Sequence, residues 1–155
     1  MNDKKIISLD YANGLIYELE KAFWDERGRG ARFRMTTVGR KFYQDRLSPL
    51  LRSPELEHIL KTVQELLQEE GIVGQVSYDL DGRLLRVTVS QCIHEQVEQR
   101  MISHGIEPFT CVPANLIVLA VEEKLDRPVE LAEIKRDENG CHLLLVLFER
   151  RPTLD

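Results

Sequence analysis

The chain has 155 residues, of which 43% are hydrophobic and 30% are charged. This balance is typical of one folded domain and excludes a disordered or fibrous protein. The net charge of −5 argues against a general nucleic-acid-binding role, because proteins of that class usually carry a basic surface.

The expected compartment follows from three features of the sequence. The first residues lack the apolar stretch of a signal peptide. The longest apolar run, Leu116 to Val121, is far shorter than the ~18 residues of a membrane span. The cysteines Cys92, Cys111 and Cys141 are odd in number and widely spaced, so they do not form a disulfide framework. We therefore expect a cytoplasmic protein with reduced thiols and no membrane span.

The first half of the chain is predicted to be helical and then to enter a hairpin. Apolar residues at helical spacing predict a helix over residues 9–26 and a second over residues 38–51. A third is expected to have Ser53 as its N-cap, to place Pro54 at its first position and to end at Gly71. Residues 73–80 and 84–90 then alternate around Asp81-Gly82, the signal of a β-hairpin.

The second half is predicted to repeat this order. We expect a short helix over residues 94–103, a buried helix over residues 113–125 and a final hairpin over residues 129–135 and 141–150. Apolar residues on both faces of the last strand predict a central strand covered on both sides. The predicted fold is α+β, a single domain in which an antiparallel sheet of about four to five strands packs against helices.

The three cysteines are candidate metal ligands. Each lies at the end of a predicted element, where the chain ends of a sheet can converge at one rim. Zinc would then have three thiolates, with His94 or Glu95 as a fourth ligand. The alternative is that Cys92, Cys111 and Cys141 are ordinary buried thiols.

Arginines are concentrated before and within the second predicted helix. Arg32, Arg34 and Arg40 belong to this basic segment and suit carboxylate or phosphate groups on a ligand or an acidic partner. The alternative is a solvated loop. Neither a Ser-His-Asp set nor a dinucleotide-binding glycine motif is present in the sequence, so we expect no catalytic residues and do not expect an enzyme.

Seven short segments occur in an order that matches a known family. They are Val38-Gly39-Arg40, Leu67-Gln68-Glu69-Glu70-Gly71, Asp81-Gly82, Ser90-Gln91-Cys92, Glu107-Pro108-Phe109-Thr110-Cys111, Leu131-Ala132-Glu133 and Asn139-Gly140-Cys141. Through them the stretch from Arg34 to Glu149 resembles the 4-vinyl-reductase-like small-molecule-binding domain. Its superfamily also includes haem nitric-oxide-binding domains and vesicle-tethering subunits.

The resemblance implies a domain over residues 34–150, with residues 1–33 as an N-terminal helix and basic loop packed on it and residues 151–155 as a tail. It also implies a homodimer, an apolar cavity and a role in hydrocarbon sensing or in bacteriochlorophyll synthesis for photosynthesis. Some members carry a cysteine metal site. Cys111 and Cys141 match two of its cysteines, but Glu133 and Ile134 stand where a third is expected; Cys92, His94 or Glu133 would have to replace it.

We therefore expect a non-catalytic module that binds a hydrophobic or tetrapyrrole-like ligand as a sensor, carrier or pigment-protein assembly factor. The expected pocket lies between the helices and the sheet, with Arg32, Arg34 or Arg40 pairing with acidic groups of the ligand. Its apolar lining is expected from Leu60, Val63, Leu116, Ala120, Leu144 and Phe148. The alternatives are a dimeric interaction subunit without a ligand, a cysteine-ligated zinc protein, and a metal-assisted enzyme with an open coordination position.

Overall fold

Four antiparallel strands form the sheet on which the rest of the chain is arranged. The structure is a computed structural model that describes residues 6–31 and 37–149. The strands are β1 (Gln75–Asp81), β2 (Leu84–Ser90), β3 (Val129–Asp137) and β4 (Gly140–Leu147). Their spatial order is β1-β2-β4-β3, with every neighbouring pair antiparallel. The expected α+β class and single domain are confirmed.

Helical segments precede each hairpin, as predicted. Their bounds are α1 (Leu9–Arg27), η1 (Gly28–Gly30), α3 (Arg40–Phe42), η3 (Tyr43–Leu47), η4 (Ser48–Leu50), α4 (Leu56–Glu69), α5 (Glu95–Ser103) and α6 (Val112–Leu125). The segment predicted as one helix over residues 38–51 is a succession of α, π and 3₁₀ turns. No helix within the described part of the chain is long and apolar enough to cross a membrane.

The predicted start of α4 is wrong by two residues. The helix begins at Leu56, and its N-cap is Glu55, which has an extended backbone and makes no side-chain capping bond. The loop before the helix is instead joined to it by one hydrogen bond: the backbone N–H of Arg52 donates to His58 Nε2 at 3.2 Å. Ser53 and Pro54 therefore lie in the connecting loop.

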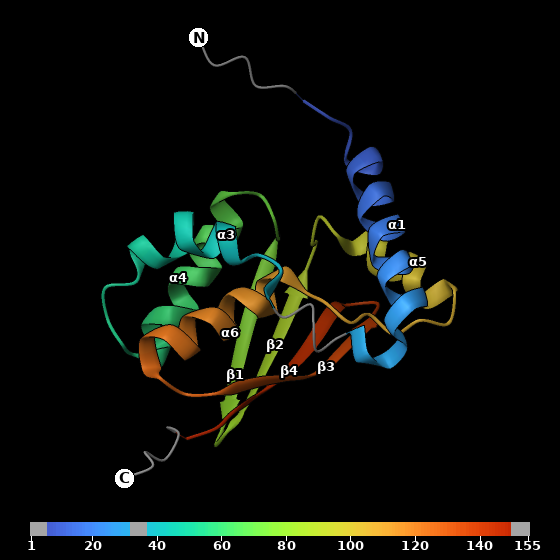
Figure 1. Cartoon of the computed structure of the whole chain (residues 1–155). Coiled ribbons are helices and arrows are strands. Elements are labelled where there is room, and N and C mark those ends of the chain that lie inside the picture. The colour runs from blue at the N-terminus through green and yellow to red at the C-terminus, as the bar shows by residue number, and fades with distance from the viewer. Residues whose placement is uncertain (1–5, 32–36, 150–155) are drawn as a thin grey trace.

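The main core lies between one face of the sheet and helices α4 and α6; Figure 1 shows α6 crossing in front of the strands. Leu85, Val87, Leu143 and Leu145 point into this core and are fully buried. The prediction that β4 is central is confirmed, because it lies between β2 and β3. The prediction that both of its faces are covered is wrong. The described helices lie on one face only, so the residues that alternate with the core positions of β4 are half-buried or exposed.

A second, smaller cluster joins α1 to α5 and to residues 106–109. Tyr17 of α1 is buried there, with the Arg100 guanidinium 4.4 Å from its ring centroid. Trp24 stacks on Phe109 with ring centroids 5.6 Å apart. In Figure 1, α1 and α5 accordingly lie together at one side of the sheet. Tyr11 and Leu15 of α1 are apolar and exposed, and the expected homodimer stays a prediction.

The turn into β4 requires glycine. Gly140 has φ +130°, and a Cβ atom at this position would lie 2.3 Å from the carbonyl oxygen of Val89 in β2. That distance is far below van der Waals contact, so any side chain would force β4 away from β2.

We therefore predict that Gly140→Ala lowers the free energy of unfolding by at least about 2 kcal/mol, measured by urea unfolding followed by circular dichroism. Gly14→Ala is the matched control, because an added methyl group at this position of α1 meets no atom within 4 Å. It should leave stability unchanged or raise it by about 0.5–1 kcal/mol. A Gly140→Ala protein as stable as the wild type would contradict the close approach of the two strands.

Candidate functional site

A pocket of about 340 Å³ lies where the α1–α5 pair meets the rest of the domain. Its walls come from α1, from α5 and the residues before it, and from residues 108–113, which lead into α6. Most of the lining is apolar; the lining residues are Ile16, Leu19, Glu20, Phe23, Val38, Cys92, His94, Val97, Glu98, Met101, Pro108, Phe109, Thr110, Cys111, Val112 and Pro113. We call this space the α1–α5 pocket.

A buried carboxyl group forms part of the pocket wall toward the sheet. Glu98 of α5 is only 6% exposed. Arg136 of β3 pairs with it, Nη1 lying 3.4 Å from Oε2, and also forms an ion pair with Glu95. Burial nevertheless raises the pKa of Glu98 more than the Arg136 guanidinium lowers it. Arg136 is thus shared between Glu98, which lines the pocket, and Glu95, which does not.

A β-bulge places Arg136 in this position. Leu131 pairs with Leu145 of β4, but Glu133 already pairs with Leu144, so Ala132 is an extra residue in β3. The extra residue reverses the alternation of the strand. Arg136, opposite Cys141, consequently points to the helix side of the sheet, and its side chain is only 10% exposed.

A second carboxyl group faces the pocket from α1. Burial raises the pKa of Glu20 to about 7, and the negative charge of Glu98 adds to this effect. Glu20 lies one turn after Ile16 and three residues before Phe23, both of which line the pocket. At neutral pH this side chain is therefore a mixture of its acid and carboxylate forms.

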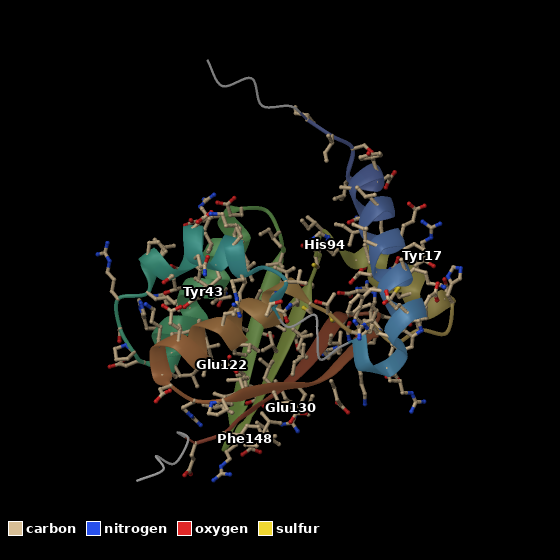
Figure 2. All side chains as sticks on the ribbon, viewed as in Figure 1. Tyr17, Tyr43, His94, Glu122, Glu130 and Phe148 are labelled. Carbon is tan, nitrogen blue, oxygen red and sulfur yellow. The ribbon has the colours of Figure 1, made fainter. Side chains whose placement is uncertain are left out.

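His94 is fixed in one tautomer by α1. The side chain of Asn13 is 2% exposed; its Nδ2 donates to the Ile93 carbonyl oxygen at 2.8 Å. Its Oδ1 is then left to accept from His94 Nδ1 at 3.2 Å. Burial lowers the pKa of His94, so the ring is neutral and Nε2 carries a lone pair. Figure 2 shows His94 between α1 and the sheet.

The structure brings the three cysteines near this pocket. Cys92 and Cys111 line it, and Cys141 lies behind them in hydrogen-bonding contact with Glu98. Burial raises the pKa of Cys92 to about 11, and burial with electrostatic repulsion from neighbouring groups raises the pKa of Cys111 and Cys141 further. All three thiols are therefore protonated at neutral pH.

These side chains do not fit a metal ion in the arrangement seen here. Within residues 6–31 and 37–149, no group of three or more His, Cys, Asp or Glu side chains is placed to hold one. Glu95 is engaged by Arg136, and Glu133 points away from the cysteines on the open face of β3. The zinc site stays a prediction.

The structure places the residues expected to line a ligand pocket on two different faces of the sheet, and that lining stays a prediction. Its residues on the helices are close-packed in the main core and line neither of the two pockets described here; they are Leu60, Val63, Leu116 and Ala120. Leu144 lies on the opposite face of β4, because the even-numbered residues of this strand point away from the helices, and Phe148 follows the strand and is exposed. Figure 2 shows Phe148 at the far end of the sheet from His94.

Arg40 is not among the residues that line the α1–α5 pocket. Arg40 lines a larger groove of about 1180 Å³ along β3, whose lining includes both basic and acidic side chains. Arg32 and Arg34 lie outside the described residues. The carboxyl-binding role expected for Arg32, Arg34 and Arg40 stays a prediction.

Sequence reasoning missed Glu20, Glu98, Asn13 and Arg136. A signal for the first three was present, since each lies within an apolar stripe of its helix. Glu98, for example, follows Val97 directly and precedes Met101 by three residues, and both neighbours are buried. A charged residue on the buried stripe of a helix indicates a partner or a site.

The chain matches no protein-family model and no curated protein.

The position of Glu20 generates a prediction about stability. Its carboxyl group holds a proton in the folded protein between pH 4.5 and about 7, where the unfolded chain has released it. Wild-type protein should therefore lose stability relative to Glu20→Gln as the pH rises through this window, by up to roughly 3 kcal/mol. Urea unfolding at a series of pH values measures the difference.

The control for this series is Glu18→Gln, which removes the same charge from an exposed position two residues away on α1. It should keep the pH dependence of the wild type. If Glu20→Gln and wild type lose stability in parallel from pH 4.5 to 7, Glu20 is not buried against the pocket.

Proposed function

We propose that this protein is a non-catalytic module that binds a small, largely apolar molecule in the α1–α5 pocket. The observation that carries the proposal is the composition of the wall. Apolar and aromatic side chains make up most of the lining, and a few polar side chains are among them: Glu20, Glu98 and His94. This is the general design of small-molecule sites, in which apolar walls provide affinity and sparse polar groups fix orientation.

The size of the pocket defines the size of ligand that we propose. About 340 Å³ lies at the lower end of the range for sites that hold drug-sized molecules. This volume favours a compact aromatic or aliphatic molecule over a tetrapyrrole. Phe23 and Phe109 both line the pocket, and their rings contact each other with centroids 6.5 Å apart.

The state of the thiols supports binding over covalent catalysis. A cysteine acts as a nucleophile only as a thiolate, and burial holds the pKa of Cys92 at about 11. Cys111 is buried and shifted in the same direction. Both thiols therefore act as part of an apolar wall at neutral pH.

We further propose that the protein acts as a sensor or a carrier of the molecule that it binds. The α1 helix supplies one wall of the pocket and contacts the remainder of the domain mainly through α5 and residues 106–109. A ligand seated between α1 and α5 would stabilise this pairing, because it fills space that both helices line. The 4-vinyl-reductase-like resemblance implies the same kind of role.

The test is a titration with 2-phenylethanol, a neutral probe. The single tryptophan, Trp24, stacks on Phe109 in the pocket wall, so its fluorescence should change on binding. Leu19→Ala should weaken binding roughly threefold to tenfold, because contact with one leucine side chain is worth about 1 kcal/mol.

Leu15→Ala is the matched control. Both leucines are exposed on α1, at 47% for Leu15 and 65% for Leu19, but only Leu19 lines the pocket. Leu15→Ala should bind as the wild type does. A wild-type protein that shows neither a fluorescence change nor a heat of binding would refute the proposal.

A further inference from the structure

We propose that the α1–α5 pocket selects a ligand that carries a hydroxyl group on an apolar body, an alcohol or a phenol, and that Nε2 of His94 accepts the hydrogen bond of this hydroxyl group. The inference rests on the proposed function and names the class of ligand for the same site. It makes His94 the residue that determines specificity.

The side chain of Asn13 fixes the position of the proton on the histidine ring. A carbonyl oxygen can only accept, so the Asn13 atom that lies 2.8 Å from the Ile93 carbonyl oxygen must be the amide nitrogen. The amide oxygen of Asn13 therefore faces His94 Nδ1 at 3.2 Å. Because this oxygen also can only accept, Nδ1 must carry the proton. Asn13 is almost fully buried, so water does not compete for either bond.

The second ring nitrogen of His94 is left with a lone pair. In a neutral ring whose Nδ1 is protonated, Nε2 is an acceptor only, and burial favours the neutral ring by lowering the pKa of His94. Within residues 6–31 and 37–149, no group donates a hydrogen bond to Nε2. This atom is not sealed in the interior either, and His94 lines the α1–α5 pocket. The lone pair is therefore available to a bound molecule.

The chemistry of a lone acceptor in an apolar wall favours a hydroxyl group. Ile16, Phe23 and Met101 line the same space and suit the apolar body of the ligand. A ligand without a donor would displace water from Nε2 and leave this acceptor unpaired, which is unfavourable. A site built around a hydrogen bond discriminates in this way against analogues that lack the polar group.

The first test compares 2-phenylethanol with its methyl ether, which has the same ring and chain but no donor. Calorimetry gives the ratio of their affinities. This ratio should favour the alcohol about threefold to tenfold more in the wild type than in His94→Leu, which corresponds to one net hydrogen bond. His104→Leu is the matched control, because His104 is an exposed histidine at the end of α5 that does not line the pocket. It should keep the wild-type ratio.

The second test needs no variant. Proton–nitrogen correlation spectra of the wild-type histidines distinguish a protonated ring nitrogen from one with a lone pair. Nε2 of His94 should be non-protonated, and its signal should shift when 2-phenylethanol binds but not when the ether binds. His104 is the internal control: its Nδ1 lies 2.9 Å from the Arg100 carbonyl oxygen, and its Nε2 signal should respond to neither probe.

Three results would overturn this inference and leave the proposed function standing. They are a proton on Nε2 of His94, an Nε2 signal that responds equally to alcohol and ether, and a folded His94→Leu protein with the wild-type ratio. The last result would assign the hydroxyl contact to a carboxyl group of the lining, Glu20 or Glu98. Binding of neither probe to the wild type would overturn both this inference and the proposed function.

Discussion

The position of the α1–α5 pocket depends on the ion pairs that Arg136 forms with α5. Two glutamates of α5, Glu95 and Glu98, pair with this one guanidinium on the helix side of the sheet. A buried carboxylate without a partner is strongly unfavourable, so α5 can pack over the end of β3 only where Arg136 meets it. Because α1 packs chiefly on α5 and the segment that follows it, the location of the N-terminal helix depends on the same pair.

The pocket follows from how the two hydrophobic clusters meet. The main core is close-packed between α4, α6 and the sheet, while the smaller cluster holds α1 against α5. Cys111 belongs to the first cluster and Phe109, two residues earlier, belongs to the second. The space between them is lined by side chains of both, so a ligand there would join two parts of the fold that otherwise touch through few residues. That arrangement suits a sensor or a carrier better than a rigid scaffold.

Local periodicity in the sequence was sufficient to predict the regular elements. The helices α1, α5 and α6 lie within a residue or two of their predicted bounds, and both hairpins form where Gly82 and Gly140 permit turns. The site was not predictable in the same way, because it depends on contacts between residues distant in sequence. The bulge at Ala132 decides that Arg136, and not Lys135, points toward α5. Simple alternation from Leu131 predicts the opposite.

The proposed location of the ligand is open to a direct test by nuclear magnetic resonance. Side-chain methyl signals would be followed while 2-phenylethanol is added to the wild-type protein. We expect the largest shifts at Leu19, Val97 and Met101, which line the α1–α5 pocket, and little change at Leu60 and Val63 in the main core. Shifts concentrated at Leu60 and Val63, or no shifts at saturating probe, would contradict the account.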